Sequence, residues 1–206
     1  YCRGYSIQKF RQKIFWIILK KCVEKVFKNP IKYDTIIDEK YLTYEPFPVG
    51  RLDKDTTGLL IITDDGDFAH KALSPKNNVF KTYRVFLDGI IPENAVSLFE
   101  EGIVLADGTK CKCAYLSPIS DCIAEIKISE GKYHQIKRMF AAVGNHVEVL
   151  MRISVGGLIL PEKLAIGECM ELLHKDVENL FLPLDFDAFC TEFSANFSAK
   201  LINKVL

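Results

Sequence analysis

The sequence lacks the features that would assign it to several broad classes of protein. Its 27 Lys and Arg residues balance 27 Asp and Glu residues, so net charge gives no argument for nucleic-acid binding, which must rest on a local patch. The apolar run IFWIILKKCVEKVF is interrupted by Lys20 and Lys21 and is too short to cross a bilayer. No secretory signal is evident. We therefore expect a cytoplasmic protein that does not engage a membrane.

The cysteines lack the spacing of a disulfide framework or a zinc site. There are seven, an odd number, which favours a reducing compartment. Cys111 and Cys113 are separated by one residue, but no second Cys or His pair follows at ligand spacing. The sequence therefore predicts no bound metal, and these two cysteines are interpreted as packed or edge thiols.

No repeat or heptad is present, and the 206 residues are 49% apolar, which is typical of one sizeable globular domain. From residue 59 onward, short strand patterns alternate irregularly with helix patterns. Strands are predicted at 59–63 and 81–89, and a helix capped by Asp67 is predicted to end before Pro75. This order indicates an α+β fold. Residues 8–28 fit either an amphipathic helix or a strand centred on FWIIL.

The stretch GRLDKDTTG, residues 50–58, places Asp53 and Asp55 close together just before an apolar strand. One interpretation is a solvated surface turn, because Asp and Thr favour turns. Another is a phosphotransferase of the haloacid dehalogenase type, whose Asp-x-Asp-x-Thr signature follows a buried strand. Here the apolar run follows the acids instead, which argues against that reaction.

Two further stretches contain candidate functional residues. In EGKYHQIKRMF, a helix beginning near Tyr133 would place His134, Lys137 and Arg138 on one side, where they could bind phosphates and bases. The alternative is a solvated helix face. In KTYRV, Tyr83 shares one strand face with Lys81, and a half-buried structural tyrosine is the alternative interpretation there.

Taken in order, these three stretches resemble the motifs of the RNA pseudouridine synthases, and more narrowly those of the RsuA branch, which modifies ribosomal RNA. The resemblance runs from about residue 47 to 180. It implies an α+β pseudouridine synthase fold, with a mixed, mainly antiparallel sheet flanked by helices and a central active cleft. We assign residues 1–180 to the catalytic domain, with the first 46 residues divergent and no separate RNA-binding domain evident. Residues 181–206 form a tail of unassigned role.

The resemblance also implies a mechanism that uses neither a cofactor nor a metal. In the family, the Asp of the Arg-Leu-Asp motif is the nucleophile, which here is Asp53. Tyr83 matches the active-site Tyr that stacks on the extruded uracil, and Lys137 matches the basic partner that favours the ionised nucleophile. Asp55, Thr56 and Thr57 are interpreted as supports of the loop.

The expected partner is ribosomal RNA, with a uridine of the small-subunit RNA as the favoured target and the protein acting as a monomer. The RNA-binding residues are predicted to be Arg51, Lys81, Lys132, His134 and Arg138. The chain has Leu19-Lys20-Lys21-Cys22-Val23 where the branch has Asn-Lys-Pro-x-Gly. An RNA-binding descendant without activity is therefore the third hypothesis, beside the synthase and the phosphotransferase.

Overall fold

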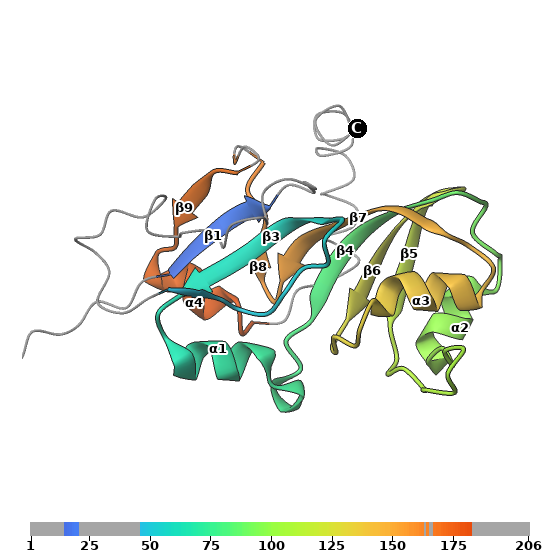
Figure 1. The fold of residues 1–206 in the computed structure, drawn as a ribbon, viewed down its shortest axis with the longest axis horizontal. Coiled ribbons are helices and arrows are strands. Elements are labelled where there is room, and N and C mark those ends of the chain that lie inside the picture. Colours follow the sequence, from blue (N-terminus) through green and yellow to red (C-terminus); the bar gives the residue numbers. More distant parts are fainter. Residues whose placement is uncertain (1–14, 21–45, 163, 165–166, 183–206) are drawn as a thin grey trace, which may run out of the picture.

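The computed structural model describes residues 15–20, 46–162, 164 and 167–182, and every structural statement below concerns these residues. Within them, nine strands form a single sheet that runs along the whole molecule (Figure 1). The strands are β1 (Phe15–Lys20), β2 (Phe47–Pro48), β3 (Thr56–Thr63), β4 (Lys81–Leu87), β5 (Tyr115–Ser120), β6 (Ile123–Ile128), β7 (Val147–Val155), β8 (Leu158–Ile159) and β9 (Cys169–Glu171).

The sheet is mixed and mainly antiparallel, as predicted. Its order is β5-β6-β4-β7-β3-β1-β9, with β2 paired to β3 and β8 paired to β7. β3 and β7 run parallel, and every other pair of these strands is antiparallel. Because β4, β7 and β3 are adjacent at the centre, residues that are far apart in the sequence meet there.

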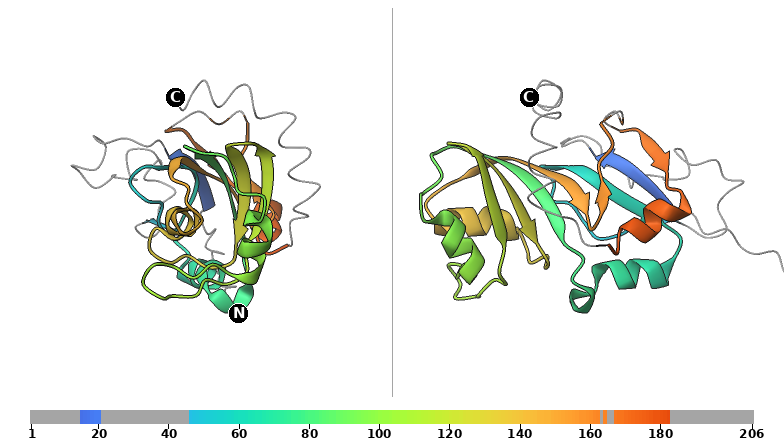
Figure 2. Two further views of the ribbon diagram at one scale, coloured as in Figure 1. Left: turned by 90° about the vertical axis from the view of Figure 1, so that its right-hand side faces the viewer. Right: turned by 180° about the vertical axis from the view of Figure 1, so that it is seen from behind.

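Helices pack against both halves of the sheet, as Figures 1 and 2 show from three directions. One hydrophobic cluster includes residues of α1 (Gly66–Leu73) and α4 (His174–Asn179), and a second includes residues of α2 (Ala95–Glu101) and α3 (Gln135–Ala142). The adjacent residues Leu150 and Met151 belong to different clusters, because successive side chains of a strand point to opposite faces. None of the described helices is long and apolar enough to span a membrane.

Strands β1 and β3 bear on two predictions made from the sequence. Residues 15–20 form strand β1, so the strand alternative is correct for that part of residues 8–28, and the remainder lies outside the described residues. Thr56 and Thr57, which the sequence analysis interpreted as loop supports, are the first residues of β3, and both are buried there. Pairing with β7 extends this strand into the motif, and the Thr57 hydroxyl donates to the Leu150 carbonyl over 3.4 Å.

Gly58 allows β3 and β7 to approach each other. Its φ of +107° is disfavoured for other residues, and a Cβ there would lie 2.2 Å from the Arg152 carbonyl oxygen. Gly58, the second glycine of the GRLDKDTTG stretch, is therefore required by the close parallel pairing that brings β7 beside the acidic turn.

Two helix boundaries differ from the sequence prediction. The N-cap of α1 is Asp65 rather than Asp67, because the Asp65 carboxylate accepts hydrogen bonds from the backbone N–H groups of Asp67 and Phe68. Helix α3 begins at Gln135 rather than near Tyr133, since His134 adopts a left-handed conformation with φ of 47°. The predicted end of α1 before Pro75 is confirmed.

Candidate active site

The three motifs identified in the sequence meet in one cleft at the centre of the sheet. The cleft has a volume of about 570 Å³. Arg51 and Asp53 come from the turn before β3, and Lys81 and Tyr83 come from β4. A further part of the lining runs from Ile128 at the end of β6, through residues 129–133, to Gln135 and Ile136 at the start of α3. The topology thus brings together residues more than 80 positions apart.

Asp53 lies in the turn that precedes β3. The Thr56 N–H donates to the Asp53 carbonyl oxygen over 3.2 Å, which closes the turn. The Asp53 side chain is 30% exposed, so it is accessible from the cleft, and His134 Nε2 lies 3.9 Å from its Oδ1. The left-handed conformation of His134 therefore places an imidazole beside the predicted nucleophile.

Tyr83 lies in the floor of the cleft and is only 8% exposed. It is held on β4 between Ile126 of β6 and Arg152 of β7. Lys81, two residues earlier, is half-buried in the same cleft. Burial and the nearby charge of Arg152 lower the pKa of Lys81 to about 8. A modest change in pH therefore alters the charge of this cleft.

Arg152 is a cleft residue that the sequence reasoning did not single out. It is 3% exposed, and its Nε donates to the Leu59 carbonyl over 2.8 Å. This bond fixes the side chain between β7 and β3. The signal in the sequence was a single cation within an otherwise apolar strand pattern, VEVLMRISV, since an arginine is rarely buried without a specific partner.

Lys137 of α3 forms an ion pair with Asp55, the second acid of the turn. Burial opposes ionisation of Asp55, but the hydrogen bond and charge of Lys137, with further contributions from a backbone hydrogen bond and His134, lower its pKa below the ordinary value. The cation predicted to act on Asp53 is thus bonded to the carboxylate two residues farther along.

Two of the other predicted basic residues, Lys132 and Arg138, are also paired with carboxylates. Lys132 forms an ion pair with Glu130. Arg138 lies 2.5 Å from Asp107 and donates a longer bond to the Tyr133 carbonyl. Arg51 is exposed at the edge of the cleft and is the predicted phosphate ligand closest in sequence to Asp53.

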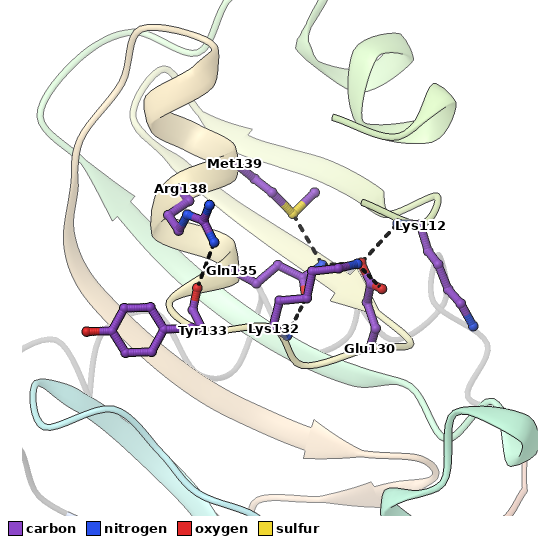
Figure 3. A network of polar contacts seen from close by, with 7 residues as sticks. All are labelled: Lys112, Glu130, Lys132, Tyr133, Gln135, Arg138 and Met139. Atoms are coloured by element: carbon purple, nitrogen blue, oxygen red, sulfur yellow. Dashed lines mark hydrogen bonds and ion pairs between the residues drawn. The ribbon is translucent and has the colours of Figure 1, made fainter. Parts of the chain in front are cut away.

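A polar network holds the segment between β6 and α3 in place (Figure 3). Gln135 Nε2 donates to Glu130 Oε1 over 2.8 Å, and Gln135 Oε1 accepts from the Lys132 N–H over 2.8 Å. Glu130 also accepts from the Lys112 N–H over 2.9 Å. The sequence reasoning missed the roles of Glu130 and Gln135, because they depend on side-chain pairing and not on spacing.

No group of three His, Cys, Asp or Glu within the described ranges is arranged to hold a metal ion. Cys111 is buried while Cys113 is exposed. The polar side chains of the cleft lining include two carboxylates, two phenols, one amide and four cations. A carboxylate in such a site can serve as a nucleophile.

Comparison with known proteins relates the sequence of this chain to a single family of enzymes. The family model described as RNA pseudouridylate synthase matches residues 17–142. The uncharacterized RNA pseudouridine synthase YtzG of Bacillus subtilis is 41% identical over 159 residues, which are 74% of this chain and 66% of that protein. The ribosomal small subunit pseudouridine synthase A of Haemophilus influenzae is 45% identical over 132 residues, which are 64% of this chain and 57% of that protein.

A solved structure described as a pseudouridylate synthase has the same fold. It superposes with a TM-score of 0.73 and 36% identity, covering 82% of this chain and 74% of the other. The predicted α+β synthase fold is therefore confirmed. The matched residues span only 66% of the Bacillus subtilis relative and 57% of the Haemophilus influenzae relative.

Proposed function

This chain belongs to the RNA pseudouridylate synthase family, and on that premise we propose that it converts a uridine of ribosomal RNA to pseudouridine. The observation that carries the proposal is the convergence of Asp53, Tyr83 and the segment before α3 on one cleft. Similarity to a synthase named for the small ribosomal subunit favours that RNA as substrate.

The proposed reaction is an isomerisation, so no atoms are gained or lost. The Asp53 carboxylate forms a bond to the ribose or to the ring, and the bond between uracil N1 and the ribose breaks, with its electron pair passing to the base. The base then turns so that C5 bonds to the ribose carbon, and the carboxylate leaves with its electron pair. The proton lost from C5 balances the proton gained at N1. Neither an oxidant nor a cofactor is required.

The charges around Asp53 support its role as the nucleophile. A carboxylate must be ionised to attack, and nearby positive charge favours the ionised form. Lys137 is paired with Asp55, whose negative charge would otherwise repel the Asp53 carboxylate in the same turn. Lys137 thus acts on Asp53 through Asp55 in this arrangement, as a positioning residue.

The remaining cleft residues are assigned to substrate binding. Tyr83 offers a ring on the cleft floor against which an extruded uracil can stack. Arg51 at the edge and Lys81 within the cleft offer positive charge to the phosphates on either side of the flipped nucleotide. Extrusion costs a few kcal/mol unless the uridine is already unpaired, so an unpaired uridine within a structured RNA is the preferred substrate.

The test is to incubate the purified protein with separate transcripts of small-subunit and large-subunit ribosomal RNA. Pseudouridine is then located by carbodiimide modification and primer extension. We expect one principal position, in the small-subunit transcript. A single position in the large-subunit transcript would contradict the substrate assignment alone. Binding to both transcripts without pseudouridine in either would contradict the enzymatic proposal and support the inactive RNA-binding alternative.

A further inference from the structure

Among the described residues that line the cleft, Tyr133 has the most exposed large apolar or aromatic side chain. It is 76% exposed, whereas Tyr83 on the cleft floor is 8% exposed. Figure 3 shows the Tyr133 ring projecting away from α3 and from the polar network beside it. The ring therefore adds little to the core, and a structural role in packing does not account for its position.

The backbone that carries Tyr133 is fixed from both sides. On one side, the Lys132 N–H donates to Gln135 Oε1, and Lys132 is paired with Glu130. On the other, Arg138 donates to the Tyr133 carbonyl over 3.4 Å. Gln135 is buried, so this support is part of the folded core. A contact residue whose backbone is held in advance loses less entropy on binding than one on a free segment.

The Tyr133 ring also stacks on the His134 ring. The ring centroids lie 3.9 Å apart and the planes differ by 17°. His134 lies 3.9 Å from the Asp53 carboxylate, so the stacked pair connects the rim of the cleft with its nucleophile. With one face against His134, most of the remaining ring surface faces solvent at the cleft rim.

We propose that Tyr133 is a stacking platform for a nucleobase adjacent to the target uridine. This inference rests on the proposed function and adds a substrate-binding residue to it. The target uracil must reach Asp53 and Tyr83 in the cleft, so a ring at the rim is placed to meet the neighbouring nucleotide. Aromatic rings stack on any base, and they are a common element of proteins that bind single-stranded RNA.

The test compares Tyr133→Leu, which removes the aromatic ring, with Tyr133→Phe, which retains it. The substrate is the RNA segment mapped in the preceding experiment. Stacking on one base corresponds to roughly a 5- to 150-fold change in affinity. We expect Tyr133→Leu to raise KM by at least about fivefold with kcat nearly unchanged, and Tyr133→Phe to behave as wild type. Tyr115→Leu, at an exposed tyrosine of β5 that is not among the cleft residues, is the matched control.

Fluorescence supplies a second readout. With 2-aminopurine placed on either side of the target uridine, one position should be quenched by wild type and Tyr133→Phe but not by Tyr133→Leu. Equal KM values and equal quenching in Tyr133→Leu and wild type would overturn the platform. If wild type forms no pseudouridine, the proposed function fails, and the platform is judged by binding to the small-subunit transcript. Weaker binding of Tyr133→Leu alone among the three variants would support it, and equal binding would overturn it.

Discussion

Lys137 and Asp55, which lie 82 positions apart in the sequence, form an ion pair that joins helix α3 to the turn carrying Asp53. The pair also links the third sequence motif to the first. Its carboxylate is 59% exposed, so the pair contributes little to global stability. We expect the ion pair to act mainly by holding the turn in place and neutralising the charge of Asp55 during the reaction.

Removing this ion pair should reduce activity more than stability. We expect Lys137→Met and Asp55→Asn each to lower kcat by about ten- to a hundredfold, as for loss of one charge-assisted hydrogen bond. The free energy of unfolding should change by less than about 1 kcal/mol. The double variant should be no worse than either single one, because both remove the same contact. Lys76→Met, at an exposed lysine that is not among the cleft residues, should be unaffected. Additive losses in the double variant would show that the pair does not act as a unit.

RNA binding should weaken as the pH rises through about 8, because Lys81 loses its charge there. The measurement is the dissociation constant of the substrate RNA between pH 7 and 9. Lys81→Arg should bind equally at both ends of this range, since an arginine stays charged. Lys81→Met should bind weakly throughout, and its salt dependence should fall by about one phosphate contact. The same pH dependence in Lys81→Met and wild type would assign the titration to another group.

The same group gives a stability prediction of opposite sign. The pKa of Lys81 is lowered on folding from 10.5 to about 8, so the unfolded chain binds more protons between these values. The free energy of unfolding contributed by this site therefore rises with pH over that window. Wild type should gain stability relative to Lys81→Met as the pH increases from about 8 toward 10.5. Denaturant unfolding at a series of pH values measures the difference, and parallel curves would refute it.

Gly58→Ala should destabilise the protein through the contact between β3 and β7. A Cβ at this position would lie 2.2 Å from the Arg152 carbonyl oxygen, a backbone atom that cannot move without shifting the strand. Strain and overpacking of this kind cost roughly 2–4 kcal/mol. Gly66→Ala is the matched control, since its Cβ would meet no atom within 4 Å and alanine favours the helix. Thermal unfolding of the two variants measures the effect, and equal melting temperatures would refute it.

Local sequence patterns predicted the elements whose formation depends on local chemistry. The strand at β4, the strand at β3 and the end of α1 before Pro75 were all predictable from periodicity and turn residues. The start of α3 was not, because His134 adopts a left-handed conformation that spacing does not reveal. Thr56 and Thr57 look like turn residues, yet pairing with β7 places them in a buried strand.

The candidate site was only partly predictable for a related reason. Resemblance to a family identified Asp53, Tyr83 and Lys137, and the structure brings their three segments together. The partners of the charged residues could not be predicted, because Asp55 and Lys137 meet only once the sheet is assembled. The role of Arg152 could not be predicted, because it depends on the hydrogen bond to the Leu59 carbonyl, which exists only in the folded sheet.

Release of tritium from C5-labelled uridine in small-subunit ribosomal RNA, with EDTA present, most directly tests the claim that Asp53 is the nucleophile. Wild type is compared with Asp53→Asn and Asp55→Asn, with Asp67→Asn as a control at an exposed acid of α1. We predict release by wild type and Asp67→Asn, reduced release by Asp55→Asn, and none by Asp53→Asn. Release by Asp53→Asn at the wild-type rate would contradict the account, as would equal losses at Asp53 and Asp55 together with a requirement for Mg²⁺.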